Sequence, residues 1–290
     1  MPSFDVPEVD YSRYSNRQLA AVPLALLALA LLVLAVWWFL NGTPVSLGIE
    51  FTGGTELTLH AATATPTQDT IRQAFSTAPL SVRSIPSQSD TFIATFEPGT
   101  NATALQNQAQ AAGFNVTATT GTSPTFGQKS QSFALLGLVG SFVGMAVVVL
   151  ALFRTFVPSA AVVVSAFGDI VVPLALMDLF GIQLSLGTVA ALLMLIGYSV
   201  DSDILLTNHV LRRSGDFYES VHRAMQTGVT MTVTSLAAMA VMTVVAYLFG
   251  IGLLTSIGII LVFGLTTDLI NTYMLNLSLL RWYKYEGVSR

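Results

Sequence analysis

Six long apolar runs follow one another along the chain, and one long polar block separates the first run from the other five. Each run is long enough to cross a hydrocarbon core about 30 Å thick, which requires ~20 helical residues. We predict six transmembrane helices, over residues 19–40, 133–153, 157–179, 186–206, 227–249 and 253–280. The rest is predicted as a polar N-terminus (1–18), a connection (207–226) and a polar C-terminus (281–290).

The polar block, residues 41–131, predicts a folded domain between the first two spans. Its pattern predicts, in order, a strand near 46–60, a helix near 66–78, strands near 80–87 and 91–97, a helix near 101–112 and a strand near 115–120. Thr65 is expected to cap the first helix, with Pro66 at its first position and Gln68 in the capping-box position. The order β-α-β-β-α-β is that of a ferredoxin-like unit. The expected fold is therefore a polytopic α-helical membrane protein with one ferredoxin-like α+β domain.

Composition agrees with a membrane protein and excludes several classes of site. Only 10% of the residues are charged and 53% are apolar, whereas soluble domains have about 25% charged residues. The chain has no cysteine, which excludes disulfides, thiolate metal sites and a catalytic thiol. The net charge of −4 argues against nucleic acid as a partner. We expect no enzymatic activity, no metal site and no cofactor.

The basic residues predict the orientation. Nine of the twelve lysines and arginines fall in segments that share one side of the membrane if the N-terminus is cytoplasmic, and the other three lie in the long block 41–131. Positive charge is concentrated in cytoplasmic loops and matters least in long ones. We therefore expect a multi-pass protein of the cytoplasmic membrane with both termini in the cytoplasm and the block 41–131 outside.

Four aspartates lie within the apolar runs, where no lysine or arginine lies at comparable depth: Asp169, Asp201, Asp203 and Asp268. A charged side chain near the bilayer centre costs roughly 2.5–3.5 kcal/mol on insertion scales, and burial disfavours the charged form of a carboxyl. A sequence that keeps several such groups is expected to use them to bind and release protons or cations. We predict that they form a proton or ion relay.

Asp201 is the first candidate for the ion-binding carboxyl, with a hydrogen bond to a hydroxyl such as Thr230 as the structural alternative. Positions 201 and 203 point about 200° apart on a helix, so one of them is expected to face the bundle and the other elsewhere. Asp203 can instead reach the cytoplasmic headgroups. Asp169 and Asp268 can alternatively serve as interhelical hydrogen-bond donors when protonated.

Two further sets of residues predict contacts or modification. Small residues at helical spacing in the second span predict close helix packing: Gly137, Gly140 and Gly144. Three Asn-X-Thr sequences in the outer block match the N-glycosylation acceptor pattern, with the acceptors Asn41, Asn101 and Asn115. Whether these acceptors are used stays open at the level of the sequence.

Two motifs resemble signatures of a known family. Residues 48–55, Gly-Ile-Glu-Phe-Thr-Gly-Gly-Thr, resemble the Gly-Ile-Asp-Phe-Thr-Gly-Gly-Thr signature that follows the first span in the SecD/SecF family of protein-export membrane proteins. Taken alone, the paired glycines indicate a bend. The residues that carry this signature are Gly48, Phe51, Thr52, Gly53, Gly54 and Thr55. In the fourth span, Gly197, Tyr198 and Ser199 belong to a segment that resembles the Ile-Gly-Tyr-Ser motif of the SecF branch.

The resemblance implies a function in protein translocation through the Sec pathway and a place in the resistance-nodulation-division superfamily. It implies a complex with SecD beside the SecY channel, in which a proton or sodium gradient across the lipid bilayer helps to pull a secreted polypeptide outward. On this interpretation we expect Asp201→Asn to impair gradient-dependent secretion while membrane insertion stays intact. Two alternatives remain open: a small-molecule or ion transporter half of the same superfamily, and a scaffold that steadies the channel without moving ions.

The chain departs from bacterial members of the family in the fourth span. After Ile-Gly-Tyr-Ser, bacterial members typically carry a hydrophobic residue, Asn, Asp and Thr, where this chain has Val200, Asp201, Ser202 and Asp203. The basic residue of the bacterial fifth span corresponds to Thr230 here. These differences resemble archaeal members, and they imply that the ion relay differs in detail from the bacterial one.

Overall fold

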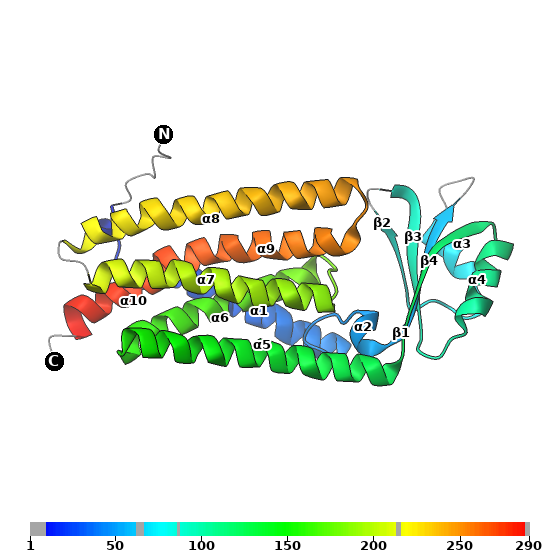
Figure 1. The fold of residues 1–290 in the computed structure, drawn as a ribbon, viewed down its shortest axis with the longest axis horizontal. Helices are drawn as coiled ribbons and strands as arrows, with labels where there is room; N and C mark the ends of the chain where they lie inside the picture. The colour runs from blue at the N-terminus through cyan, green and yellow to red at the C-terminus, as the bar shows by residue number, and fades with distance from the viewer. Residues whose placement is uncertain (1–9, 62–66, 86–87, 213–215, 288–290) are drawn as a thin grey trace.

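Six long helices form a bundle, and a small α+β domain stands at one end of it (Figure 1). The computed structural model describes residues 10–61, 67–85, 88–212 and 216–287. The long helices are α1 (Asn16–Asn41), α5 (Pro124–Phe153), α6 (Phe156–Leu179), α7 (Leu186–Arg212), α8 (Phe217–Leu248) and α9 (Gly252–Ile270). The chain continues directly from α9 through the π-helix η2 (Asn271–Asn276), α10 (Leu277–Trp282) and the π-helix η3 (Tyr283–Gly287). By length and composition, these helices confirm the six predicted spans.

Helices α6 and α7 form the centre of the bundle, and α1, α5 and α8 form its periphery. The most apolar stretches of α6 and α7 are 61% and 56% buried, against 17% in α1, 6% in α5 and 11% in α8. Large apolar side chains such as Phe39, Phe133 and Leu248 are exposed on the peripheral helices. An apolar surface of this extent requires lipid or another membrane subunit as its surroundings.

Two of the long helices begin well before the predicted spans. Helix α5 begins at Pro124, and Ser123 caps it by accepting a hydrogen bond from Phe126 N. Helix α8 begins at Phe217 after the cap Asp216, so much of the connection predicted over 207–226 is helical. Hydropathy locates the apolar part of each helix, whereas polar first turns with a good cap extend the helix beyond it.

The β domain, residues 54–122, lies between α1 and α5 in the chain. Its elements are β1 (Gly54–Ala61), α3 (Gln68–Gln73), β2 (Ser81–Ile85), β3 (Gln88–Phe96), α4 (Ala102–Ala111) and β4 (Phe114–Thr122). The four strands form one sheet in the order β2-β3-β1-β4, and all neighbouring strands are antiparallel. This is the β-α-β-β-α-β order that the sequence predicts, and it is the order expected of a ferredoxin-like unit.

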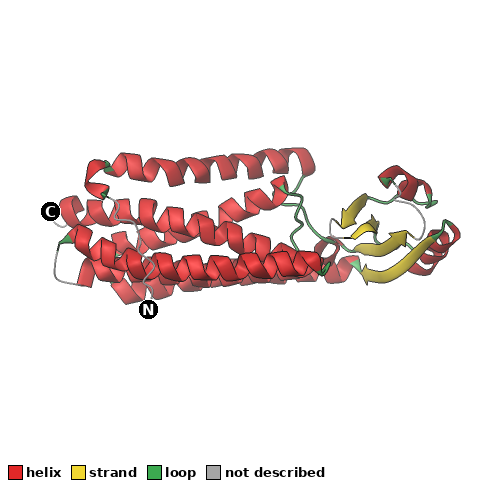
Figure 2. Ribbon diagram, turned by 90° about the horizontal axis from the view of Figure 1, so that it is seen from above, coloured by secondary structure: helices red, strands yellow, loops and turns green. Residues whose placement is uncertain are grey.

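The two faces of the sheet have different surroundings. Leu57, Leu59, Phe92 and Phe96 point to one face and pack with side chains of α3 and α4 into the core of the domain. Because side chains alternate along a strand, polar neighbours such as Glu56 point to the opposite face. Figures 1 and 2 show that α3 and α4 lie on the side away from the bundle, so the helix-free face of the sheet is turned toward it.

A cleft of about 550 Å³ lies between this helix-free face and the end of the bundle. The sheet contributes Glu56, Arg83 and Ile93 to its lining, and residues 48–50, the α6–α7 loop and the first turns of α9 contribute most of the rest. The Arg83 guanidinium donates to Gln183 Oε1 at 2.8 Å and lies 3.6 Å from the Glu56 carboxylate. The β domain is therefore joined to the bundle through side chains as well as through the chain itself.

Residues 48–55 do not form the continuous strand that the pattern predicts. Ile49–Thr52 form one helical turn, α2, and β1 starts only at Gly54. Gly53 and Gly54 have φ angles of 76° and 136°, a region that glycine enters without steric cost. The paired glycines thus provide the expected bend. The cap of α3 also differs from the prediction: it is Thr67, and the predicted cap at position 65 lies outside the described residues.

Helix α2 packs against the first turns of α5 with no room for a side chain between them. A Cβ on Gly127 would lie 2.7 Å from Phe51 O, and a Cβ on Gly53 would lie 2.9 Å from Pro124 Cα. Both obstacles are backbone atoms, which cannot rotate away as a side chain can. The close approach therefore fixes the angle at which the β domain leaves the bundle.

Gly127→Ala is expected to destabilise this junction by about 1–3 kcal/mol, because overpacking forces the two backbones apart. The measurement is the thermal midpoint of the purified protein, together with proteolysis of the segment around α2. Gly137→Ala on the same helix is the control, because a Cβ there meets nothing within 4 Å. Alanine is also the better helix former, so this control is expected to be at least as stable as the native chain. Equal midpoints for the two variants would contradict the packing described.

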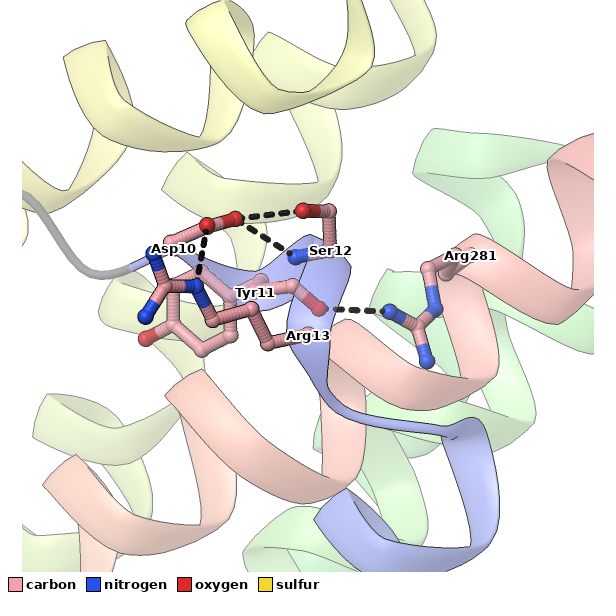
Figure 3. A network of polar contacts seen from close by, with 5 residues as sticks. All are labelled: Asp10, Tyr11, Ser12, Arg13 and Arg281. Carbon is pink, nitrogen blue, oxygen red and sulfur yellow. Dashed lines mark hydrogen bonds and ion pairs between the residues drawn. The ribbon is translucent and has the colours of Figure 1, made fainter.

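At the end of the bundle far from the β domain, Arg281 of α10 holds the segment that precedes α1 (Figure 3). Its guanidinium donates to Tyr11 O at 3.0 Å, to Tyr14 O at 2.8 Å and to Asn16 Oδ1. Tyr11 begins the short 3-10 helix η1 (Tyr11–Arg13), and burial raises the pKa of its hydroxyl to about 12. The first and last spans are thereby joined at this end.

Candidate functional site

Three of the four intramembrane carboxyls meet inside the bundle. Asp169 comes from α6, Asp203 from α7 and Asp268 from the end of α9, and these residues are 0%, 0% and 1% exposed. We refer to Asp169, Asp203 and Asp268 as the carboxyl cluster. Helices α6, α7 and α9 pack against one another within the bundle, so the protein itself encloses the cluster.

Asp169 is held by donors from two other elements. Ser199 Oγ of α7 donates to Asp169 Oδ2 at 2.5 Å, and Asn271 Nδ2 of η2 donates to Asp169 Oδ1 at 2.7 Å. Asn271 can approach because Gly168 has no side chain: a Cβ there would lie 2.7 Å from Asn271 Nδ2. This one carboxyl therefore joins α6, α7 and η2.

Asp203 and Asp268 share a hydroxyl. Thr272 Oγ1 lies 2.9 Å from Asp203 Oδ1 and 3.2 Å from Asp268 Oδ1. Asn276 Nδ2 also donates to Asp203 Oδ1 at 2.8 Å, and Ser202 Oγ lies 2.8 and 3.0 Å from the two oxygens of Asp268. A threonine hydroxyl has one proton and can donate to only one carboxyl at a time. The states of the two carboxyls are therefore linked.

No basic side chain neutralises the carboxyl cluster within the part of the chain that the structure describes. The ion pairs among the described residues involve Arg13, Arg83 and Arg223, all of which pair with other acids. No group of three His, Cys, Asp or Glu side chains in the same residues is arranged to hold a metal. Unpaired buried carboxylates are very costly, so the cluster requires protons, a cation or a charge from another subunit.

The chain adopts a π-helix where it passes the cluster. The π-helix η2 supplies Asn271, Thr272 and Asn276, and π turns are rare and concentrate at functional sites. Sequence reasoning did not single out these three residues. A signal was present for two of them: Thr272 and Asn276 follow Asp268 at four-residue intervals in the sixth span and therefore line the same side of the helix.

Asp201 lies outside the carboxyl cluster. It is exposed on α7, whereas Asp203 is buried, as their separation of about 200° requires. The burial of Asp203 contradicts the alternative in which it reaches the headgroups, and the ion-binding role of Asp201 stays a prediction. Asp201 borders a cavity of about 90 Å³ between α7 and α8, together with Tyr198 and Ser202. Ser202, which lines this cavity, also contacts Asp268, so the cavity lies next to the cluster.

The Ile-Gly-Tyr-Ser segment of α7 lies between the cluster and this cavity. Ser199 contacts Asp169, and Tyr198 borders the cavity. Gly197 has nothing within 4 Å of the position of a Cβ, so it does not act through close packing within this chain. The motif therefore presents one side to the carboxyls and another to the surface of the bundle.

The small residues of the second span face outward. A Cβ on Gly137, Gly140 or Gly144 would meet nothing within 4 Å. The predicted packing against these glycines does not occur within the described chain, and it would require another protein chain.

The three asparagines of the glycosylation patterns are exposed: Asn41, Asn101 and Asn115. Asn101 has a second role as the cap of α4, because its side chain accepts hydrogen bonds from Thr103 N and Ala104 N. Their modification remains a prediction from the sequence.

The chain before the β domain is paired with the loop between α6 and α7. Leu47 and Leu184 form a parallel bridge. Gly48 N donates to Leu184 O at 2.8 Å, and Leu184 N donates to Ser46 O at 2.7 Å. We refer to this pairing as the loop bridge. It connects the β domain to the two helices that carry Asp169 and Asp203.

Two carboxylates strengthen the loop bridge. Asp178 Oδ1, near the end of α6, accepts a hydrogen bond from Ser46 N at 2.9 Å. Glu50 Oε2 in α2 accepts one from Leu186 N, at the start of α7, at 2.5 Å. A carboxylate at a helix N-terminus also interacts favourably with the helix dipole. Movement of α6 or α7 along its axis would therefore pull directly on residues 46–50.

Both sequence motifs and the whole chain match a known family. The family described as protein export membrane protein SecD/SecF, C-terminal, matches residues 102–286, and the SecD/SecF GG motif matches residues 38–65. Protein-export membrane protein SecF of Haloferax volcanii is 63% identical, and that of Haloquadratum walsbyi is 60% identical, each over 100% of both chains. SecF of Methanolacinia petrolearia is 42% identical over 96% of this chain and 97% of its own.

Solved structures share the fold. The crystal structure of SecDF, a translocon-associated membrane protein from Thermus thermophilus, matches 96% of this chain with a TM-score of 0.74 and 20% identity. A SecDF structure in a super-membrane-facing form matches 98% with a TM-score of 0.62 and 20% identity. This chain spans 39% and 40% of those longer chains. With a family match over more than half of its length and full-length curated relatives, the chain belongs to the SecF branch of the SecD/SecF family of protein-export membrane proteins.

Proposed function

We propose that this SecF-type subunit couples a proton or sodium gradient to protein export across the cytoplasmic membrane. It works with SecD beside the SecY channel, with both termini in the cytoplasm and the β domain outside. The carboxyl cluster carries the proposal: acids from three helices meet at shared hydroxyls, with no basic partner in the described residues. The names of the relatives support export as the setting, and none of them is named as an enzyme.

Loading and release of an ion changes the contacts between helices. When Asp268 is neutralised, Thr272 is free to donate to Asp203 alone, and the reverse holds when Asp203 is neutralised. Each state favours a different distance between α7 and η2, because the hydroxyl moves toward the carboxyl that remains charged. The cavity beside Asp201 and Ser202 provides the path by which water and ions reach the cluster.

The loop bridge passes this movement to the β domain. Helix α6 ends and helix α7 begins at the α6–α7 loop. That loop is paired with residues 46–48. A shift of either helix changes the cleft between the sheet and the bundle, because Arg83 and Gln183 face each other across it. The ion site and the β domain are thereby parts of one mechanical unit.

A secreted polypeptide can bind to this unit through the edge of the sheet. Strands β2 and β4 form the two edges, and β4 is the longer, with mostly exposed residues. Strand addition uses backbone groups and reads few side chains, which suits polypeptides of varied sequence. Unchanged crosslinking of a translocating chain to the domain after the β4 edge is blocked would argue against this contact.

The test of the proposed function is export into vesicles that contain the chain, its SecD partner and the channel. Completion of a stalled secreted chain is expected to accelerate when a proton or sodium gradient is imposed, and to slow when an ionophore collapses it. Completion that is insensitive to every gradient would favour the scaffold. Gradient-dependent release of a drug or lipid in place of polypeptide would favour the small-molecule transporter.

A further inference from the structure

Two cavities follow one another along one side of α8. The first, which we call the end cavity, measures about 530 Å³ and lies between η1 and the first turns of α8, at the end of the bundle far from the β domain. The second, which we call the inner cavity, is the one of about 90 Å³ beside Asp201 and Ser202. Along this side of α8, the end cavity is lined by Val221 and Met225, and the inner cavity by Gly228, Thr232 and Ser235.

The two cavities are close together. Their five lining residues on α8 share one side of the helix, because spacings of four, three, four and three residues follow its turns. The step from the last residue of the end cavity, Met225, to the first residue of the inner cavity, Gly228, is about 4.5 Å along the helix axis. A single layer of side chains therefore separates the cavities.

This layer contains the ring of Tyr273 from η2. A Cβ on Gly228 would overlap the Tyr273 hydroxyl oxygen, so the ring reaches α8 only because position 228 has no side chain. Leu205 lies beside the same point, and both Gly228 and Leu205 line the inner cavity. The Tyr273 hydroxyl therefore lies at the wall of the inner cavity that is nearest to the end cavity.

The same hydroxyl indicates that the inner cavity holds water. Tyr273 is 6% exposed, and its hydroxyl has no hydrogen-bond partner among the described residues, whereas buried polar atoms nearly always have one. A water molecule needs polar partners and a space of only about 10–15 Å³. Asp201, Ser202 and Thr232 supply further polar groups on the lining. We therefore expect Tyr273 to bond to water in the inner cavity.

Tyr11 covers the layer from the side of the end cavity. It lines that cavity, is 8% exposed and belongs to the same buried apolar cluster as Met225 and Tyr273. Arg281 fixes its backbone by donating to Tyr11 O at 3.0 Å (Figure 3). The position of the Tyr11 ring therefore depends on the segment that Arg281 holds.

We propose that Tyr273 and Tyr11 form the gate of a water route that runs along α8 from the end cavity to the inner cavity. In the structure the gate is closed, and the two cavities are separate. When the two rings move away from α8, the water of the end cavity joins that of the inner cavity. The route then ends at Ser202, whose hydroxyl contacts Asp268.

The gate is connected to the carboxyl cluster through η2. Thr272, whose hydroxyl lies between Asp203 and Asp268, directly precedes Tyr273 in the chain. A movement of η2 that follows the state of the two carboxyls therefore also moves the Tyr273 ring against Gly228. This connection, and the cytoplasmic location of the end cavity, rest on the proposed function. The route itself can be measured without any export.

The test uses the absence of cysteine from the chain. Ser235→Cys exchanges one oxygen for sulfur in the inner cavity, and His222→Cys places a thiol in the end cavity. The full chain and its SecD partner are kept in membrane vesicles whose cytoplasmic side faces outward. A charged methanethiosulfonate reagent is added, and labelling of this chain is followed by mass. The thiol at 222 is expected to react fast and the thiol at 235 slowly.

Removal of either ring is expected to open the route. Tyr11→Ala and Tyr273→Ala should each raise the labelling rate of Ser235→Cys by about tenfold, because thiol reactivity follows access to solvent. Tyr14→Ala is the matched control: Tyr14 belongs to the same segment, but it is 50% exposed and lines neither cavity. Tyr273→Phe keeps the ring and is expected to label as slowly as the native background.

Gly228→Ala tests the same layer without removing a ring. Its Cβ would displace the Tyr273 hydroxyl, so faster labelling of Ser235→Cys is expected. Adding Tyr273→Phe to this variant should restore slow labelling, because the next ring atom, Cζ, lies 3.5 Å from that Cβ. The thermal midpoint of each variant shows whether the bundle is folded.

Three results would overturn the gate. They are fast labelling at position 235 in the native background, slow labelling in both folded alanine variants while position 222 still reacts, and an equal effect of Tyr14→Ala. Export that follows a gradient while labelling ignores both tyrosines would remove the gate and leave the proposed function standing. A gate that opens as described, in a complex whose export ignores every gradient, would support the route and remove the proposed coupling.

Discussion

Asp268→Asn is expected to reduce gradient-dependent export by about a hundredfold, the lower end of what a positioned proton-transferring group contributes. Asp268 is 1% exposed and contacts Ser202 and Thr272. Asparagine has nearly the same shape, but its side chain cannot gain or lose a proton. It also replaces one of the two oxygens that accept from the Ser202 hydroxyl with an NH2 group, which only donates. The measurement is the rate at which a stalled secreted chain completes translocation into vesicles under an imposed gradient.

Asp201→Asn provides the comparison for this experiment. Asp201 lies outside the carboxyl cluster and is exposed at the edge of the cavity between α7 and α8, so its loss is expected to slow export far less. The thermal midpoints of both variants report whether the bundle is intact. If Asp268→Asn exported at the native rate with the gradient still required, the carboxyl cluster would not be the coupling site.

Gly48→Pro is expected to lower export by about tenfold, because it breaks a loop bridge whose hydrogen bonds contribute roughly 1 kcal/mol each. Proline lacks the N–H that Gly48 donates to Leu184 O at 2.8 Å. The φ of −78° at Gly48 suits proline, so the α2 turn itself is expected to persist. The two quantities to measure are the export rate and the change in the thermal midpoint of the protein when ions are added.

Gly48→Ala separates the lost hydrogen bond from the added atoms. Its Cβ would lie 3.2 Å from Leu184 O, a tight contact that small shifts can relieve, and its N–H remains. Export by the alanine variant is expected to stay near native. A proline variant with native export would mean that the β domain does not need the α6–α7 loop in order to move. If the thermal midpoint of the proline variant no longer changed when ions are added, the substitution would instead have damaged the bundle.

The architecture was largely predictable from the sequence. Uninterrupted apolar runs and alternating strands identified six spans and the β-α-β-β-α-β domain, because both patterns follow directly from burial. The first nine residues of α5, 124–132, and the α2 turn at residues 49–52 were not predicted. Each depends on a local feature that hydropathy does not register: a capping serine at 123 and two glycines with positive φ.

The candidate site was predictable only in part. Charge in an apolar run pointed to Asp169, Asp203 and Asp268, but the sequence could not say which of Asp201 and Asp203 faces inward. That choice depends on how α7 is rotated against α6 and α9. The partners on η2 were missed because Asn and Thr are tolerated singly in membrane helices, and only their spacing from Asp268 indicates a shared side.

Helix α5 has a geometric consequence for the β domain. It is one unbroken helix of 30 residues from Pro124 to Phe153, or about 45 Å at 1.5 Å per residue. Its first turn is packed against α2 through Gly127, so a tilt of the helix would carry the β domain with it. A tilt of about 10° about its distant end would carry that first turn sideways by about 8 Å. A sub-ångström adjustment near the distant end of α5 would in this way move the β domain by more than the length of two extended residues.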